Sequence, residues 1–254
     1  MRKHLLCSFI ALMACMSFSA CSSTALTNRS QLMLLNSQEE IALGEQSAKQ
    51  VLQQSKVSNN QKQAQMIQRV GQRIADVAER PDFVWEFYLL EDEQVNAFCL
   101  PGGKVFVYTG LMPLVASDDE LAVVLSHEIA HTILRHGAER MSMQTLQQIG
   151  GGLLGIIVGS AVPEYSNLFN QAYSIGSNVG VMLPFSRSHE LEADKAGILL
   201  MQKAGYNPKA AISFWQKMSE NGEKSSSDFL STHPNDSKRI AEIEKLLAQQ
   251  EQNK

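Results

Sequence analysis

Two histidines and a glutamate in the stretch VVLSHEIAHTILRHG, residues 123–137, have the types and spacing of a catalytic metal centre. His127 and His131 are four residues apart, so on a helix both imidazoles project from one face and could chelate the same zinc ion. Glu128 is turned aside, where it could take a proton from a metal-activated water and later deliver it to a leaving amine. The competing interpretation is a core helix with two hydrogen-bonded histidines, but the apolar, capped context favours the metalloprotease helix. We expect His136 to support a ligand or to act as a helix-end cation, not to bind metal.

A catalytic zinc needs a third protein ligand and leaves its fourth position to water. The segment SRSHELEAD, residues 186–194, supplies a candidate in Glu190. On a helix Glu190 and Asp194 share a face, so one carboxylate can reach the metal while the other hydrogen-bonds the free ring nitrogen of a histidine ligand. His189 is a rival ligand, but it lies about 100° around the helix from Glu190. Glu192 points elsewhere, and we expect it to be solvated.

The residues around these two segments predict the elements that must position them. Ser117, with Glu120 three residues later, predicts the start of the metal helix. Strand-like segments at residues 83–90, 95–100 and 104–110, with a Pro-Gly-Gly turn before the last, predict a small antiparallel sheet. The expected fold class is α+β and mostly helical, with this sheet beside the HExxH helix, as in a zincin-like metalloprotease domain. Further helices are expected at residues 37–55, opening on a capping-box pattern of Ser37 and Glu40, and at residues 59–80, 186–204, 208–219 and 236–249.

Composition limits the classes of function. The chain has 254 residues, of which 44% are hydrophobic, and its formal net charge is -4. These values fit one globular domain with a substantial core and lack the basic surface of a nucleic-acid-binding protein. The glycine-rich stretch at residues 149–162 is apolar but too short to cross a membrane. We expect a flexible, partly buried connection there, with a mobile element near the site or a membrane-facing patch as the alternative.

The first residues have the features of an export signal. Two basic residues precede an apolar run that ends in Ser-Ala before Cys21, which resembles a bacterial lipobox. We therefore expect a signal peptide at residues 1–20 and acylation of Cys21 as the first residue of the mature chain. Cleavage before Cys15, an ordinary secretory signal and an uncleaved anchor are the alternatives.

The expected domain layout follows from that signal. A polar tether at residues 21–36 leads into a zinc metallopeptidase domain at residues 37–254. Ser22, rather than an aspartate, follows the cysteine, which favours the outer membrane by resemblance to the sorted lipoproteins of Gram-negative bacteria. Once the signal is removed and Cys21 is acylated, only Cys99 would remain free, so no disulfide framework is expected.

The motifs HEIAH and HELEAD resemble those of the zinc metallopeptidase family (gluzincins) of the prenyl-CAAX proteases and the HtpX heat-shock protease, particularly its periplasmic lipoprotein branch. The segments NAFCLPGGKVFVYTGLM and STHPNDSKRI are also similar to family segments, and the resemblance covers about residues 39–243. It implies that His233 or Arg239 stabilises the oxyanion of the tetrahedral intermediate. His233 could instead be a fourth zinc ligand in a resting state. The alternative is an incidental loop histidine and a surface arginine.

The expected activity is that of an endopeptidase with one Zn²⁺ per chain, held by His127, His131 and Glu190. Asn96 and Ala97 precede the hairpin on an expected sheet edge, where an extended peptide could add as another strand. Pairing of this kind reads backbone shape, so broad specificity for unfolded chains would follow.

The resemblance and the export signal, rather than any residue, indicate the biological setting. We expect a protein anchored by its N-terminal lipid on the periplasmic face of the outer membrane of a Gram-negative bacterium, where it removes unfolded or misfolded envelope proteins. A chaperone-like assembly factor for outer-membrane proteins, with a latent metal site closed by His233, is one alternative. A structural lipoprotein with a stabilising zinc is another.

Overall fold

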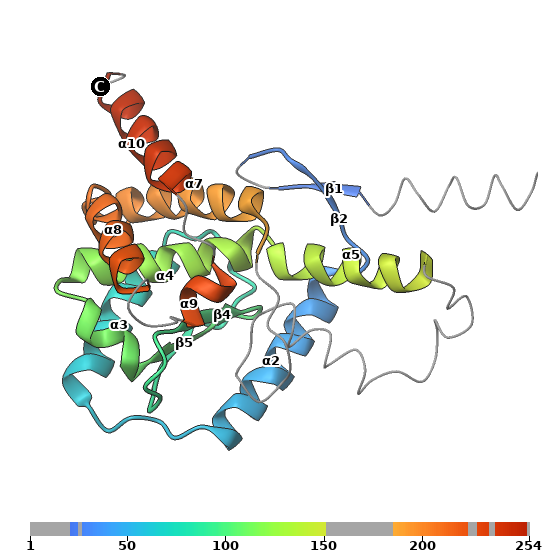
Figure 1. Cartoon of the computed structure of the whole chain (residues 1–254). Helices are drawn as coiled ribbons and strands as arrows, with labels where there is room; N and C mark the ends of the chain where they lie inside the picture. The colour runs from blue at the N-terminus through green and yellow to red at the C-terminus, as the bar shows by residue number, and fades with distance from the viewer. Residues whose placement is uncertain (1–20, 25–26, 151–184, 223–227, 234–236, 253–254) are drawn as a thin grey trace, which may run out of the picture.

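The computed structural model describes residues 21–24, 27–150, 185–222, 228–233 and 237–252. Within these residues the chain is mostly helical with a small three-stranded sheet, which confirms the predicted α+β class (Figure 1). The predicted signal peptide and the glycine-rich stretch after residue 150 lie outside the described residues. The helices are α2 (Ser37–Gln54), α3 (Gln61–Ala75), α4 (Asp118–Ile133), α5 (His136–Gly150), α7 (Arg187–Lys203), α8 (Ala210–Gly222), α9 (Asp228–Thr232) and α10 (Ser237–Gln252). The strands are β1 (Cys21–Ser23), β2 (Ser30–Leu32), β3 (Glu86–Leu90), β4 (Ala97–Leu100) and β5 (Lys104–Tyr108), and η1 (Thr109–Leu114) is a 3-10 helix.

The three-stranded sheet is mixed. Its strand order is β3-β5-β4, and β4 pairs with β5 as the antiparallel hairpin that the Pro-Gly-Gly turn predicts. The predicted antiparallel pairing does not extend to β3, which pairs with β5 in parallel, with Glu86 opposite Lys104. Turn residues specify only the pairing of strands that follow one another. The hairpin inserts β5 between β3 and β4, and that choice depends on packing.

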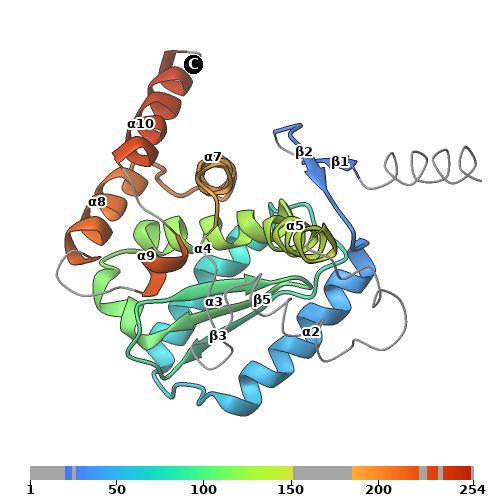
Figure 2. The same cartoon turned by 45° about the vertical axis from the view of Figure 1, so that its right-hand side comes forward.

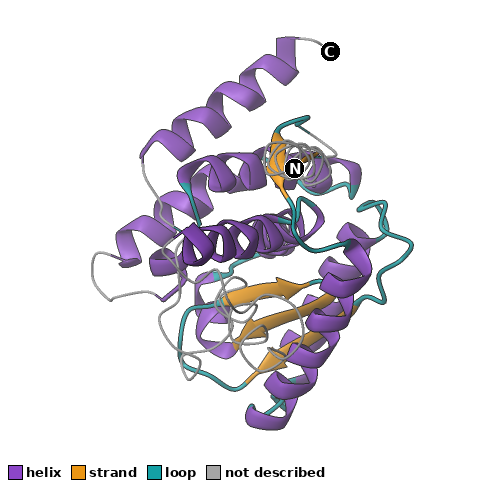
Figure 3. Ribbon diagram, turned by 90° about the vertical axis from the view of Figure 1, so that its right-hand side faces the viewer, coloured by secondary structure: helices purple, strands orange, loops and turns teal. Residues whose placement is uncertain are grey.

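Both faces of the sheet are covered by helices (Figure 2). Leu90, Phe98 and Phe106 pack with α2 on one face, and Cys99 and Val107 pack with α3 and α4 on the other. This alternation follows from the two-residue period of a strand. Figure 3 shows helices on either side of the strands. Every residue of β4 and β5 is therefore buried.

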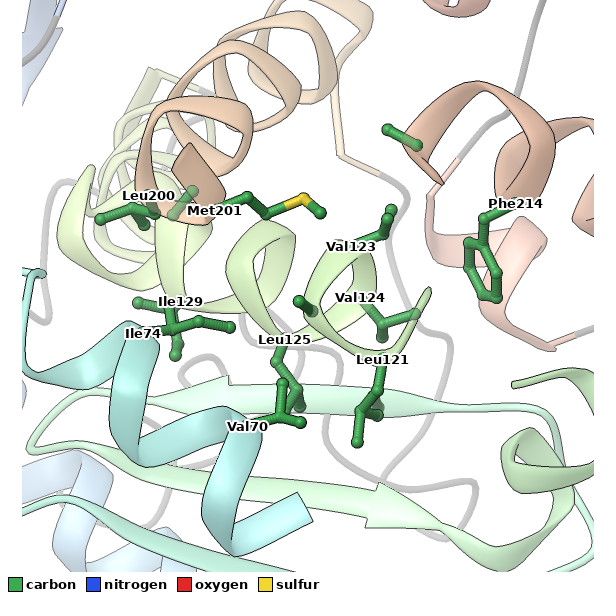
Figure 4. Close-up of a cluster of buried hydrophobic side chains, with 14 of the residues drawn as sticks. Val70, Ile74, Leu121, Val123, Val124, Leu125, Ile129, Leu200, Met201 and Phe214 are labelled. Atoms are coloured by element: carbon green, nitrogen blue, oxygen red, sulfur yellow. The ribbon is translucent and has the colours of Figure 1, made fainter. Parts of the chain in front are cut away.

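The metal helix α4 lies in the core, and its residues 121–132 are all buried. Ile74 of α3 packs near Ile129 of α4, and Val70 packs near Leu125 (Figure 4). A helix that is apolar around most of its circumference needs such neighbours on every side. Helix α3 is therefore part of the core.

Helix α7 crosses α4 closely enough to bring its acidic residues to the histidines. A Cβ atom added at Gly197 would lie 3.2 Å from both the backbone nitrogen of His127 and Oγ of Ser126. Glu190, Asp194 and Gly197 recur at helical spacing, so all three lie on one face of α7. Gly197 thus permits the close approach of α7 to α4 that brings Glu190 and Asp194 to the histidines.

The helix starts largely match the sequence patterns. Ser117 caps α4 as predicted. Asn36 caps α2 and forms the capping box with Glu39, one residue earlier than the predicted pair of Ser37 and Glu40. Asn36 has the extended backbone that an N-cap requires. The sequence patterns did not predict α5 or α9.

Residues 27–32, here called the N-terminal arm, pack on the catalytic helices. Strands β1 and β2 pair antiparallel within the predicted tether at residues 21–36. The side-chain amide of Gln31 donates to the carbonyl oxygen of Leu134, the C-cap of α4, at 2.7 Å. The arm is thus bound to the end of the metal helix.

The substitution Ile74→Ala tests the packing of α3 on α4. Ile74 is fully buried, so the shorter side chain leaves a cavity. We expect the free energy of unfolding in urea to fall by about 2–5 kcal/mol. Val84→Ala is the control, because Val84 is 63% exposed, and we expect it to change that free energy by at most about 0.5 kcal/mol. Equal effects would contradict a core position for α3.

The thiol of Cys99 tests the burial of β4. Burial raises the pKa of this thiol to about 12, so very little of it is thiolate at neutral or mildly basic pH. In a chain that begins at Ser22, we expect Ellman's reagent to leave the native protein unmodified and to titrate Cys99 once guanidinium chloride unfolds it. Rapid modification of the native protein would show that β4 opens to solvent.

Candidate metal centre

Four buried donors from three segments meet inside the fold. His127 and His131 come from α4, Glu190 comes from α7, and His233 follows α9. One donor atom of each side chain lies within 4.8 Å of the others, and all four side chains are buried. The structure therefore brings together the three predicted ligands, with His233 as a fourth neighbour.

The separations between these donors fit a coordination shell. Nitrogen and oxygen donors at zinc bond lengths of about 2.0–2.1 Å lie about 3.3–3.4 Å apart in a tetrahedron. The observed separations of 3.1–3.4 Å are close to these distances, and imidazole and carboxylate are ordinary zinc ligands, so the residues fit Zn²⁺. The Nε2 atom of His127 lies 3.1 Å from His131 Nε2, 3.3 Å from His233 Nδ1 and 3.4 Å from Glu190 Oε2. The Oε1 atom of Glu190 lies 3.3 Å from His131 Nε2 and 3.1 Å from His233 Nδ1.

Glu128 lies beside the donors. Its side chain is buried, and its Oε1 lies 3.5 Å from His233 Nε2. Among the described residues this oxygen has no hydrogen-bond partner, as expected of a carboxylate that faces the place of a water or substrate. Burial raises the pKa of Glu128. The shift brings its proton affinity closer to that of a general base working near neutral pH.

Asp194 and Arg239 support His127. The Nδ1 atom of His127 lies 3.0 Å from Asp194 Oδ1, so Asp194 is the carboxylate beside the free ring nitrogen of this histidine. Arg239 donates from Nε and Nη2 to the two oxygens of Asp194, each at 2.7 Å. Its Nη1 lies 2.8 Å from Glu190 Oε2. The alternative of a surface arginine is wrong, because Arg239 is only 2% exposed.

The electrostatics favour a cation among the donors. Burial opposes ionisation of Glu190, but His233 and Arg239 hold its pKa well below the usual value, so Glu190 is a carboxylate. Burial lowers the pKa of His127, but Asp194 and Glu190 outweigh it and raise that pKa to about 9. The site thus attracts positive charge, and a bound metal ion would take the place of that proton.

His136 supports the second histidine. It is the first residue of α5, and its Nδ1 lies 3.0 Å from His131 Nδ1. Burial lowers the pKa of His136 to about 4, so the alternative of a helix-end cation is wrong. On its other side His136 Nε2 lies 3.2 Å from Glu192 Oε2. The expectation that Glu192 is solvated is also wrong, because α5 and the N-terminal arm cover it.

The rival ligand His189 faces away from the four donors. Its Nε2 lies 3.1 Å from Glu139 Oε2. Its ring stacks on that of His136, with centroids 4.5 Å apart and an interplanar angle of 16°. Of the two neighbouring candidates, Glu190 therefore lies with the histidines of α4.

Aromatic rings that the sequence analysis missed surround the donors. The ring centroid of Phe185 lies 4.0 Å from that of His131, and the centroid of Trp215 lies 5.3 Å from that of His127. Phe229 stacks on His233 at 4.5 Å. These side chains restrict the orientations of the imidazoles. Their spacing carries no local signal, because each ring comes from a different segment.

The predicted substrate-binding residues lie at a sheet edge. Ala97 begins β4, an edge strand of the three-stranded sheet beside α4. Oδ1 of the buried Asn96 accepts from the backbone nitrogen of Ala97 at 2.9 Å. Thr132, next to His131, donates to the carbonyl oxygen of Cys99 at 2.7 Å and joins this strand to the metal helix. The edge position agrees with the position predicted from the sequence, and peptide binding there stays a prediction.

The fold and the donors together define an HExxH metallopeptidase domain. A model of Peptidase family M48 matches residues 61–247 of the chain, which include the metal helix, Glu190 and His233. The chain belongs to peptidase family M48. The predicted metallopeptidase family is thereby confirmed, while the finer resemblance to HtpX and the prenyl-CAAX proteases stays a prediction.

Curated relatives align with the same region. The mitochondrial metalloendopeptidase OMA1 of Schizosaccharomyces pombe is 39% identical over 183 residues, which cover 71% of this chain and 52% of the relative. Human OMA1 is 34% identical over 172 residues, which cover 65% of this chain and 33% of the relative. The beta-barrel assembly-enhancing protease of Escherichia coli is 29% identical over 210 residues, which cover 80% of this chain and 43% of the relative. The chain thus spans about half the length of these relatives, or less.

Substitution of Glu190 and of His189 tests which of the two is the third metal ligand. We expect Glu190→Gln to weaken Zn²⁺ binding by more than about 100-fold, beyond the effect of groups that only support a ligand. His189→Gln should retain bound zinc, because His189 faces Glu139. Metal content after dialysis against a weak chelator measures both. Zinc lost from His189→Gln and kept by Glu190→Gln would reverse the assignment.

Proposed function

We propose that the chain is a zinc-dependent metalloendopeptidase, with His127, His131 and Glu190 as ligands and Glu128 as general base. The observation that carries the proposal is the buried cluster of four donors with the Glu128 carboxylate beside it. Polar groups removed from water destabilise a core unless they find partners. A divalent cation provides a common partner for these donors. Membership of peptidase family M48 supports the same activity.

The proposed chemistry divides between the ion and the chain. A bound Zn²⁺ supplies a Lewis acid that polarises a carbonyl group and lowers the pKa of water to about 7. Glu128 accepts the proton of the attacking water and passes it to the leaving nitrogen. Its raised pKa suits both roles, because the protonated form must also be accessible.

Arg239 is proposed as a positioning residue. We predicted that it could bind an oxyanion, but its three donor nitrogens already contact Asp194 and Glu190. Oxyanion binding is therefore assigned to His233. In the present arrangement His233 Nδ1 is as close to Glu190 as the other donors are, so it is proposed to hold the fourth position. Catalysis then requires His233 to move aside.

Extended peptides are the proposed substrates. The edge strand β4 is joined to α4 through Thr132, so a peptide beside Asn96 and Ala97 would run along the metal helix. Main-chain hydrogen bonds of this kind require an unfolded segment and depend little on its sequence. Unfolded or misfolded chains would therefore be cleaved in preference to folded ones.

The proposed location is the periplasmic face of the outer membrane. In the described part of the chain, no helix has the length and apolar character needed to cross a bilayer. The lipobox-like sequence before Cys21 supports lipid anchoring. A relative named for enhancing beta-barrel assembly, from a Gram-negative bacterium, supports an envelope setting. Misfolded or unassembled envelope proteins are the substrates that this setting offers.

A second candidate function is assembly of outer-membrane proteins, with proteolysis held in reserve. The observation that favours it is the position of His233, whose Nδ1 lies 3.3 Å from His127 Nε2 and 3.1 Å from Glu190 Oε1. A fourth protein donor leaves no place for water. In this case the chain would bind unfolded barrels and cleave them only when His233 is displaced.

The substitution Glu128→Gln tests the proposed mechanism. It keeps the size of the side chain but removes the base, so we expect the degradation rate of unfolded casein to fall by about 10²–10⁴-fold. Zinc content should not change, because Glu128 is not a proposed ligand. Glu79→Gln is the matched control at a surface ion pair and should cleave like the wild type.

A cell assay with the same variant separates the two candidate functions. If Glu128→Gln abolishes both the cleavage of substrate and the effect of the protein on the cell envelope, proteolysis is the function. A phenotype that survives without cleavage would support the assembly role. Cleavage at the wild-type rate would remove Glu128 from the mechanism.

A further inference from the structure

A second buried polar cluster lies beside the donors, where the N-terminal arm meets α5 and α7. Its cation is Arg29 of the arm, whose side chain is 30% exposed. Arg29 donates from Nη1 and Nη2 to the two oxygens of Glu139 on α5, at 2.7 and 2.6 Å. Its Nε donates to Oε2 of Glu192 on α7 at 2.7 Å. One guanidinium thus joins two helices that the site depends on.

This cluster continues to a proposed metal ligand. Glu192 Oε2 lies 3.2 Å from His136 Nε2, and His136 Nδ1 lies 3.0 Å from His131 Nδ1. The Nε2 atom of His131 faces the other donors. Three contacts therefore connect Arg29 to His131.

The direction of each hydrogen bond is fixed once His131 binds through Nε2. A neutral imidazole that offers one nitrogen to a metal carries its proton on the other, so Nδ1 of His131 is the donor. Nδ1 of His136 must then accept, which leaves the proton of His136 on Nε2. That proton is donated to Glu192, whose carboxylate can only accept. Arg29 supplies the final donor.

Each histidine of the metal helix is linked to a carboxylate that an arginine holds. His127 contacts Asp194, and Arg239 holds the Asp194 carboxylate. His131 contacts Glu192 through His136, and Arg29 holds the Glu192 carboxylate. Arg239 comes from α10, whereas Arg29 comes from the arm. Partners of this kind orient metal ligands and raise their affinity.

We propose that Arg29 is a positioning residue for the metal ligand His131, acting through Glu192 and His136, so that the N-terminal arm forms part of the metal centre. A planar guanidinium can hold both carboxylates at once, whereas an ammonium group is a single point of charge. Thr27 of the arm also donates to Glu192. The inference rests on the proposed zinc site.

Zinc affinity of Arg29 variants of the full chain tests the inference. Competition with a chromophoric chelator gives the dissociation constant. We expect Arg29→Met to weaken Zn²⁺ binding by about tenfold, the lower end of the effect of residues that support ligands, because two side chains separate Arg29 from His131. Arg29→Lys should lie between this variant and the wild type, because it keeps the charge without the fork.

Arg69→Met is the matched control. Arg69 forms a similar two-nitrogen contact with Asp118, which lies in the first turn of α4, far along the helix from His131. Its removal should leave the zinc affinity unchanged. A double-mutant cycle with His136→Gln adds a readout that general destabilisation would not give. The two losses should be clearly less than additive, since both substitutions break one chain of contacts.

The possible outcomes separate the two proposals. A wild-type chain that does not bind zinc would remove the proposed metal site, and the inference with it. A wild-type chain that binds zinc, with unchanged affinity in Arg29→Met and Arg29→Lys, would overturn the inference alone. Additive losses in the cycle would also overturn it. If Arg29→Met fails to fold, as judged by circular dichroism, the Arg29→Lys variant and its cycle decide.

Discussion

The contact between α4 and α7 is the constraint on which the rest of the structure depends. Histidines of one helix and carboxylates of the other meet without bulk water between them, and Gly197 is where the backbones approach. Ionised groups are strongly destabilised in such surroundings unless they are paired. Burying α4 between α3, the sheet and α7 therefore creates a requirement for compensating charge. A metal ion and arginine side chains are the groups that can meet it.

The arginines meet this requirement from outside the metal helix. Arg239 divides its donors between Asp194 and Glu190, and Arg29 divides its donors between Glu192 and Glu139. Each guanidinium thereby fixes two carboxylates relative to each other. A rigid fork suits this task because its geometry is set by one planar group. The C-terminal helix α10 is thus tied to α7, and the N-terminal arm is tied to both α7 and α5.

The position of His233 connects the chemistry of the site to its control. Its ring stacks on Phe229 and contributes a nitrogen to the donor cluster. Helix α9 is held near the edge strand, because the backbone nitrogen of Phe229 donates to the carbonyl oxygen of Val95 at 3.1 Å. A peptide at the edge of β4 would approach this short helix. Under the proposed function, the peptide would therefore bind next to His233, the residue that must leave the fourth coordination position of the metal.

The sequence by itself determined the features that depend on near neighbours in the chain. Helical spacing placed His127 and His131 on one face, Ser117 set the start of α4, and the Pro-Gly-Gly turn specified the β4–β5 hairpin. Tertiary structure alone decided that β3 joins in parallel, that Glu192 is buried and that the arm reaches the site. Arg29 lies more than 100 residues from Glu139 and from Glu192. Such contacts arise from how the helices pack, and no local pattern of residues encodes them.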